Sequence, residues 1–298
     1  MSQRGTEESA AAPPRTGVLF VVATPIGNLD DLSPRARAVL AEVDLIAAED
    51  TRHSAALLRH CAISTRCVAL HEHNEREASA DLVRQMLAGR RIALISDAGT
   101  PLISDPGYRI VRAAREAGVT VSPIPGACAA IAALSAAGMP SDRFVFEGFL
   151  PAKSAARRAR LQELAAETRT LIFYESSHRI VDALADFVAV FSEARAVVLA
   201  RELTKRFETL IDGSLGEVVA RVLADADQQR GEFVLLIAGA TQSDAAARLV
   251  EGRRVHALLA RDLSPSRAAR LAAEITGAPR NALYTASRQD DEEVADED

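Results

Sequence analysis

From Gly17 onward the chain alternates short apolar runs with segments of helical periodicity, and this alternation constrains the fold more than any other feature. Five apolar runs predict strands, at Val18–Ala23, Asp44–Ala48, Val68–Leu70, Arg91–Ile95 and Val119–Pro123. Helical patterns between them lie at Ser33–Leu40, Ala80–Ala88 and Tyr108–Glu116. Because strands that alternate with helices usually pair in parallel, the sequence predicts a mostly parallel sheet covered by helices.

A second α/β unit is predicted after Pro125-Gly126, a dipeptide that interrupts the pattern. Its predicted strands are Phe144–Phe149, Thr170–Tyr174, Ala196–Ala200 and Phe233–Ala238. Its predicted helices are Ala155–Ala166, Ile180–Val190 and Leu215–Leu223. We therefore expect an N-terminal α/β domain over residues 16–126 and a second α/β domain over residues 127–241.

Residues 245–288 change character and predict a small helical module. Helical patterns cover Ala245–Leu259, Ser264–Ile275 and Pro279–Ala286, with Gly277 at the turn between the last two. This arrangement is typical of a helix-turn-helix-like unit. The segment has eight arginines and three acidic residues, a formal charge of +5 that suits contact with phosphates. The alternative is a bundle that caps the second domain with a solvated face.

The formal net charge of −6 is dominated by one end of the chain. The last ten residues contain seven acids, and without those seven charges the total would be +1. The body of the chain therefore does not exclude a nucleic acid partner. We expect residues 1–15 and the acidic tail, residues 289–298, to be disordered. No apolar run is long enough to span a membrane, and the first residues lack a secretory signal pattern, so we expect a cytoplasmic protein.

The segment from Ser96 to Gly107 is the strongest local signal for a ligand site. It follows a predicted buried strand and combines two glycines, two prolines and the carboxylates of Asp97 and Asp105. Glycine permits close approach of the backbone to a ligand, and proline stiffens the loop. Similar bends follow two other strands, at residues 24–28 and 125–127. Ligands bind beyond the carboxyl ends of parallel strands, so the three bends predict one shared cleft.

Several common sites are excluded by their missing motifs. No GxGxxG follows the first strand, and neither a P-loop nor a GxSxG elbow occurs. His71 and His73 are two residues apart and would point to opposite sides of an extended chain, with no clear third ligand. The three cysteines have no CxxC spacing. We therefore predict no metal site and no disulfide.

Polar residues cluster at four further strand ends, at Glu49–His53, His71–Glu75, Tyr174–Arg179 and Arg201–Lys205. Together with the three bends, they closely resemble the ribosomal RNA small-subunit methyltransferase I family, within the tetrapyrrole methylase-like superfamily of S-adenosylmethionine (SAM)-dependent enzymes. The resemblance covers almost the whole chain except its tails. It implies two α/β domains with SAM between them, a helical C-terminal module and a homodimer. The implied reaction is methylation of the ribose 2′-hydroxyl of cytidine 1402 in the decoding region of 16S ribosomal RNA.

The resemblance and the strand-end chemistry assign roles to individual residues. The expected SAM-binding residues are Pro25, Gly27, Asp97, Ala98, Gly99, Thr100, Asp105, Gly107, Pro125, Gly126, Ala127, Tyr174 and Glu175. Candidates for catalysis are Glu49, Arg52, Glu175 and Lys205, and the sequence does not select the base among them. Expected RNA contacts, in the 30S subunit or its 16S RNA, are Arg157, Arg158, Arg160, His178, Arg179, Arg267 and Arg270. No membrane partner is expected.

Two other functions remain open at this stage. A methyltransferase of the same fold could act on a tetrapyrrole or a modified amino acid, although a small-molecule enzyme needs no basic helical module. A non-catalytic helix-turn-helix protein with an inert α/β domain would not need so many polar residues at its strand ends.

Overall fold

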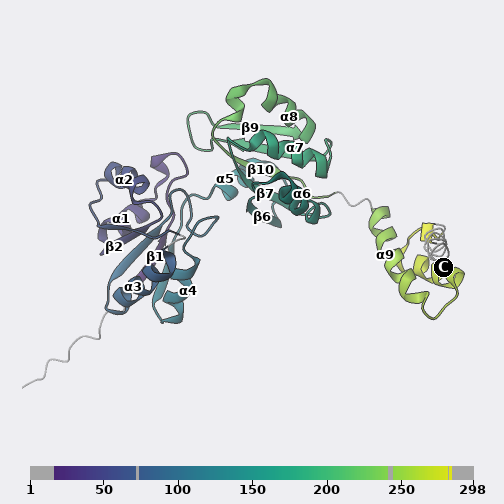
Figure 1. The fold of residues 1–298 in the computed structure, drawn as a ribbon, viewed down its shortest axis with the longest axis horizontal. Helices are drawn as coiled ribbons and strands as arrows, with labels where there is room; N and C mark the ends of the chain where they lie inside the picture. Colours follow the sequence, from purple (N-terminus) through teal and green to yellow (C-terminus); the bar gives the residue numbers. More distant parts are fainter. Residues whose placement is uncertain (1–16, 72–73, 241–243, 281, 284–298) are drawn as a thin grey trace, which may run out of the picture. The chain divides into compact units, whose positions relative to one another are not determined.

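The computed structural model describes residues 17–71, 74–240, 244–280 and 282–283, which form two compact units with a boundary after Ala238 (Figure 1). The first unit holds two β-sheets, and the second holds the C-terminal helices. The predictions for residues 1–15 and 289–298 lie outside the described residues.

The first sheet contains five parallel strands in the order β3-β2-β4-β1-β5. The strands are β1 (Val18–Val22), β2 (Leu45–Ala48), β3 (Cys67–Ala69), β4 (Arg91–Ile95) and β5 (Thr120–Ile124). The predicted parallel sheet is therefore confirmed. All five carboxyl ends lie at one edge, where the polar strand-end motifs begin.

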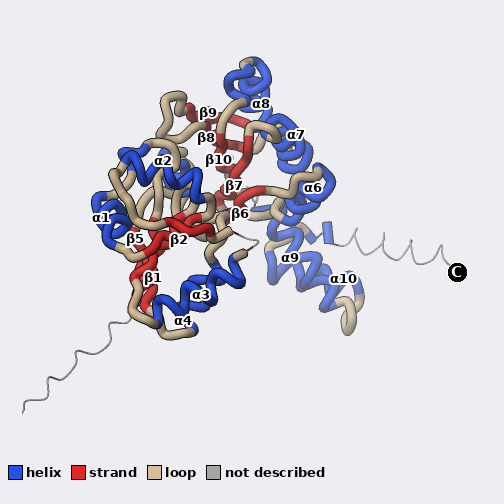
Figure 2. The backbone as a smooth tube through the Cα atoms, turned by 60° about the vertical axis from the view of Figure 1, so that its left-hand side comes forward, coloured by secondary structure: helices blue, strands red, loops and turns tan. Residues whose placement is uncertain are grey.

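Helices cover both faces of this sheet (Figure 2). One face packs against α1 (Pro34–Glu42) and α2 (Thr51–His60), through buried side chains such as Leu40 and Leu57. The other face packs against α3 (Glu75–Leu87) and α4 (Tyr108–Glu116). Helix α2 was not predicted from the sequence. It begins at the cap residue Asp50, whose carboxylate accepts a hydrogen bond from the Arg52 amide.

The second sheet is mixed, with strand order β6-β7-β10-β8-β9. Its strands are β6 (Phe144–Phe149), β7 (Thr170–Ser176), β8 (Ala196–Arg201), β9 (Thr209–Ser214) and β10 (Glu232–Ile237). Only β6 and β7 pair in parallel, and the other pairs are antiparallel. Strand β9 was missed because its six residues include Asp212, Gly213 and Ser214, which rarely occur inside strands.

Four helices cover the second sheet. On one face lie α6 (Ser154–Glu163), α7 (Ile180–Phe191) and α8 (Leu215–Ala224), which bury Phe173 and Phe187 between them and the strands. On the other face lies α5 (Ala129–Ala136), a second helix missed from the sequence. Short 3-10 turns at Leu29–Asp31 and Ala226–Gln229 complete the unit.

The second unit contains α9 (Asp244–Leu259) and α10 (Pro265–Thr276), in the places predicted. Ala269, Ala272 and Leu283 form its small buried core. Gly277 adopts a φ of 69° and ends α10, as the glycine turn predicts. The third predicted helix, over residues 279–286, lies largely outside the described residues.

Candidate active site

Hydrogen bonds join three loops at the carboxyl edge of the first sheet. The Thr24 amide donates to the Gly99 carbonyl (2.8 Å), and the Gly99 amide donates to the Thr24 carbonyl (3.1 Å). The Thr100 hydroxyl donates to the Ala127 carbonyl (2.9 Å). The loops that follow β1, β4 and β5 are therefore held together, as the three Gly/Pro bends predicted.

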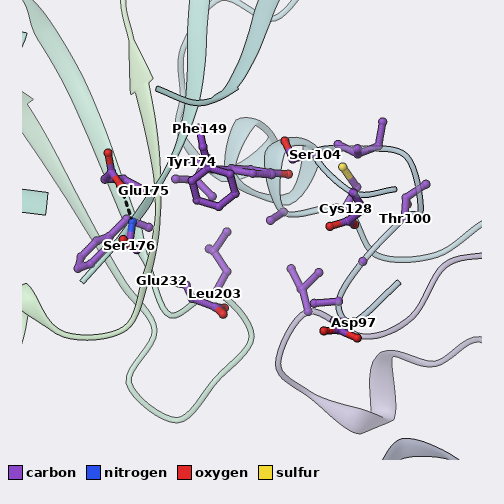
Figure 3. A pocket seen from close by; sticks show the side chains of 18 of the residues that line it. Asp97, Thr100, Ser104, Cys128, Phe149, Tyr174, Glu175, Ser176, Leu203 and Glu232 are labelled. Carbon is purple, nitrogen blue, oxygen red and sulfur yellow. Dashed lines mark hydrogen bonds between the residues drawn. The ribbon is translucent and has the colours of Figure 1, made fainter. Parts of the chain in front are cut away.

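A cavity of about 390 Å³ lies beside these loops, and we name it the central cavity (Figure 3). Residues from the first sheet's loops form one side of it: Ile26, Glu49, Asp97, Ala98, Gly99, Thr100, Ile103, Ser104 and Asp105. Residues after β5 and from the second sheet form the rest: Cys128, Ala129, Phe149, Tyr174, Glu175, Ser176, Leu203, Glu232, Phe233 and Val234. Both sheets therefore contribute to one site.

The central cavity has an excess of negative charge. No lysine or arginine is among its lining residues, whereas Glu49, Asp97 and Asp105 all reach it. Glu49 Oε2 is buried and has no hydrogen-bond partner in the described part of the chain. A buried acceptor without a donor is costly, so this oxygen indicates that a ligand supplies the donor or the positive charge.

The electrostatic environment raises two pKa values in this cluster. Burial, followed by repulsion from Asp97, raises the pKa of Glu49 above its ordinary value. Burial, followed by repulsion from Glu49, raises the pKa of Asp105 to about 6. Both shifts have the same cause, because desolvation and like charges favour the neutral form of a carboxyl group.

Aromatic rings form one wall of the central cavity. The Phe149 and Tyr174 rings meet edge to face with centroids 5.6 Å apart, and Phe149 is 55% exposed (Figure 3). Tyr174 is held in place because its hydroxyl accepts a hydrogen bond from the Ala130 amide (3.0 Å) at the start of α5. The wall thus offers an apolar, rigid surface for a planar group.

A second hollow of about 480 Å³ adjoins the central cavity and shares Ile26, Asp97, Ala98 and Glu232 with it. Pro25, Gly27, Arg52 and Lys205 line this second hollow. The Lys205 side chain lies against Gly27, where an added Cβ would meet Lys205 Cγ at 2.5 Å. A side chain at position 27 would therefore displace the lysine.

Lys205 and Glu175, two of the catalytic candidates, are held in ion pairs. Lys205 Nζ lies 2.8 Å from Glu202 Oε1 and 2.9 Å from Glu232 Oε2. Glu175 is buried, accepts a hydrogen bond from the Ser176 amide and lies 3.0 Å from Arg179 Nη2. These contacts suit residues that position loops, whereas Glu49 retains an oxygen that is free to accept a proton.

The remaining predicted SAM ligands lie near the central cavity without lining it. Gly107 lines a third hollow, of about 440 Å³, which shares Glu49, Ser104 and Asp105 with the central cavity. Gly126 lies against Ala23, where an added Cβ would come within 2.8 Å of the Ala23 Cβ. Pro125 and Ala127 are likewise absent from the lining of the central cavity.

The structure corrects one predicted RNA contact. Arg157 is buried, and its Nε donates to Asp186 at 2.7 Å, so its guanidinium is out of reach of a phosphate. Helical periodicity could not reveal this, because the arginine's partner lies on α7, 29 residues along the chain. Arg158 also pairs with Asp186, and Arg160 pairs with Glu147 and Glu163.

The other predicted RNA contacts differ in exposure. His178 is exposed and is not among the lining residues of the central cavity. The Arg179 guanidinium is occupied by Glu175 and by the Leu150 carbonyl. Arg267 and Arg270 are exposed on α10 in the C-terminal unit. Only His178, Arg267 and Arg270 therefore present side chains that no described residue holds.

Sequence reasoning missed several cavity residues, notably Ser104, Phe149, Leu203 and Glu232. Ser104 lies inside the Ser96–Gly107 motif, and Phe149 ends a predicted strand, so position alone could have indicated both. Leu203 and Glu232 come from segments adjacent in the second sheet, and only the antiparallel pairing of β8 and β10 brings them together.

Two further features concern the described residues as a whole. No group of three or more histidine, cysteine, aspartate or glutamate side chains in them is arranged to hold a metal ion. None of the described helices combines the length and apolarity required to cross a bilayer.

Comparison with known proteins gives the family. Residues 18–219 match the model for Tetrapyrrole (Corrin/Porphyrin) Methylases. The chain is 57% identical over 268 residues to ribosomal RNA small subunit methyltransferase I of Xylella fastidiosa strain Temecula1, covering 90% of this chain and 98% of that protein. The chain belongs to the ribosomal RNA small subunit methyltransferase I family. The family member of Escherichia coli O157:H7 is 56% identical over 270 residues, which are 90% of this chain and 93% of its own.

The family assignment extends to the C-terminal unit and to the fold. Residues 246–287 match the model for the RsmI C-terminal HTH domain, so the predicted helix-turn-helix-like module is confirmed. A crystal structure of diphthine synthase matches with a TM-score of 0.56 and 15% identity over 74% of this chain and 90% of that chain. A cobalt precorrin-4 methyltransferase matches with a TM-score of 0.55 and 15% identity over 75% and 95%. These similarities to solved structures establish the fold.

Proposed function

We propose that this protein transfers a methyl group from SAM to 16S ribosomal RNA, at the ribose 2′-hydroxyl of cytidine 1402. The observation that carries the proposal is the high identity to small-subunit ribosomal RNA methyltransferases along 90% of the chain. The C-terminal unit supports RNA over a tetrapyrrole as the substrate, since Arg267 and Arg270 are exposed there and free to meet phosphates.

The residues of the central cavity fit SAM. Its volume, about 390 Å³, lies in the range of small-molecule sites. The uncompensated carboxylates of Glu49, Asp97 and Asp105 complement a ligand that carries a sulfonium and an ammonium group. The Phe149–Tyr174 wall offers a face for a purine. SAM supplies a methyl group made electrophilic by the sulfonium, and we propose that Asp97–Thr100 and Tyr174 hold it.

The acceptor hydroxyl needs to be oriented and to lose a proton. We propose that the Glu49–Asp105 pair takes this proton, because both carboxylates reach the central cavity and the adjoining third hollow. A base with a pKa near the working pH is the most effective, and Asp105, with a pKa of about 6, meets this requirement. Alignment of hydroxyl and methyl donor can supply a further 7–11 kcal/mol or so of barrier reduction.

Arg52, Glu175 and Lys205 have positioning roles in this proposal. Arg52 is exposed at the edge of the second hollow, where it can meet a phosphate of the acceptor strand. Glu175 and Arg179 fix the loop after β7, and Lys205 fixes the loop after β8 against Gly27.

The protein would act as a homodimer in the cytoplasm, where small subunits are assembled. Sedimentation analysis tests whether it forms a dimer.

Transfer of tritium from labelled SAM tests the proposed function. We expect label in the 16S RNA of undermethylated small subunits, at the ribose of cytidine 1402, and none in tetrapyrroles. Label in a tetrapyrrole would support the rival substrate class. RNA binding without any transfer of label would support a non-catalytic binding protein instead.

A further inference from the structure

Helices α3 and α4 lie side by side on one face of the first sheet (Figures 1 and 2), and a hollow of about 420 Å³ runs between them. We name it the α3–α4 groove. Its lining includes Arg76 and Ser79 from α3, and Tyr108, Arg109, Arg112 and Glu116 from α4. Three arginines and one acid line the groove, and the neighbouring Glu75 pairs with Arg109, so a formal charge of +1 remains.

All three arginine side chains are exposed, although two of them also pair with glutamates. The Arg76 guanidinium is exposed and has no hydrogen bond or ion pair with any residue that the structure describes. The Arg109 side chain is 63% exposed, although its Nε forms an ion pair with the buried Glu75 Oε2 at 3.7 Å. Arg112 is bonded to Glu116 at 2.7 Å but is also 63% exposed. Arginine binds phosphate oxygens through its planar fork, so the groove suits a phosphodiester backbone.

Tyr108 adds a surface for a base. Its side chain is 63% exposed at the start of α4, although large hydrophobic residues are normally buried. The Arg112 Nη1 donates to its hydroxyl (3.4 Å), which restrains the ring beside the groove. Exposed aromatic rings next to arginines are typical of sites for single-stranded RNA, where bases stack while phosphates meet positive charge.

The third hollow adjoins both the α3–α4 groove and the central cavity, because it shares lining residues with each. The third hollow shares Tyr108 and Arg109 with the groove. It shares Glu49, Ser104 and Asp105 with the central cavity. An RNA chain bound in the groove could therefore place its next nucleotide beside the carboxylates of Glu49 and Asp105, along the protein surface.

We infer that the α3–α4 groove binds the single-stranded RNA next to the methylated nucleotide and leads that nucleotide into the third hollow. This inference rests on the proposed function and specifies the RNA path for it. The inference uses none of the arginines of the C-terminal unit, and it gives Arg76, Tyr108 and Arg112 positioning roles that the strand-end motifs did not predict.

The double variant Arg76→Ala/Arg112→Ala tests the inference. We expect its affinity for purified small subunits, measured by filter binding, to fall at least about tenfold, because two charge-assisted contacts are lost. The slope of log affinity against log salt concentration should also become shallower by about 1.4, because each phosphate contact on single-stranded RNA contributes roughly 0.7 to that slope. SAM affinity, measured by calorimetry, should stay within about twofold. Arg115→Ala is the matched control, since Arg115 is exposed on α4 outside the lining of the groove.

Tyr108→Leu provides an independent variant that leaves every charge in place. We expect weaker binding with an unchanged salt dependence, because stacking and the hydrogen bond from Arg112 are lost while no charge is removed. Wild-type affinity and salt dependence in both variants would overturn the inference, as would an equal loss in Arg115→Ala. Failure of the proposed function is distinguishable, because it appears as a lack of tritium transfer by the unmodified protein.

Discussion

At the scale of single residues, the site depends on carboxylates that the fold holds in an unfavourable environment. Asp105 lies close to Glu49 and Asp97 and is partly buried in the loop that precedes α4. Its raised pKa means that the native state binds this proton more tightly than the unfolded chain does. Above pH 6 the charged side chain therefore destabilises the fold, a cost that active sites commonly carry.

Asp105→Asn removes both the destabilisation caused by the charged carboxylate and the proposed catalytic base. At pH 7.5 we expect the variant to be more stable by about 1–2 kcal/mol, a value reduced for the solvent that still reaches the group. The gain should disappear as the pH falls from about 6 to below 4, where the wild-type carboxyl is protonated in both states.

Urea unfolding at several pH values measures the stability, and tritium transfer should fall by about 10²–10⁴-fold in the same variant. Asp212→Asn, at an exposed position on β9, is the control and should change neither quantity. A variant that is less stable than the wild type at pH 7.5 would show that Asp105 has a structural role instead.

At the scale of helices and strands, the second half of the first unit depends on a buried ion pair. Asp186 on α7 accepts hydrogen bonds from Ser154 Oγ and Arg157 Nε, both on α6. Burial acts to raise the pKa of Asp186, but hydrogen bonds from Arg158, Ser154 and Arg157 bring it below its ordinary value. The α6–α7 pair is thus fixed by a carboxylate that is charged at neutral pH.

Asp186→Ala would leave the Arg157 guanidinium buried without its partner. We expect a loss of about 3–5 kcal/mol in the free energy of unfolding, because an unpaired buried charge costs far more than the pair contributes. Asp182→Ala, at an exposed position in the first turn of the same helix, should cost less than about 1 kcal/mol. Equal effects of the two substitutions in urea unfolding would contradict this account.

How far the sequence predicts this molecule varies between elements. The first sheet follows from its apolar runs, because β4 is almost entirely buried, β1 is buried or half-buried along its length, and both strands contain few polar residues. Helix α5 was missed because Ala129–Ala136 is apolar on all sides and shows no helical periodicity. Asp97 and Asp105 could be predicted from their loop, whereas Arg157 and Leu203 depend on partners that only the tertiary structure supplies.

At the scale of the whole molecule, we propose a separate role for each compact unit: the first binds SAM, and the second contacts RNA. The first unit builds a cavity from both of its sheets, and the second unit presents arginines on α10. The central claim concerns the first unit: loops joined by hydrogen bonds at the edge of a parallel sheet form a negatively charged site for SAM. Asp97 is the residue to test, because it lines the central cavity and the second hollow and holds the Asp50 amide at 3.1 Å.

Calorimetric titration of SAM into the wild-type protein and Asp97→Ala tests this claim most directly. We expect one site per chain in the wild type and at least about a tenfold weaker affinity in the variant, from the loss of one charged contact. Asp212→Asn should bind SAM as the wild type does. Equal affinity of Asp97→Ala and the wild type would contradict the placement of SAM in the central cavity.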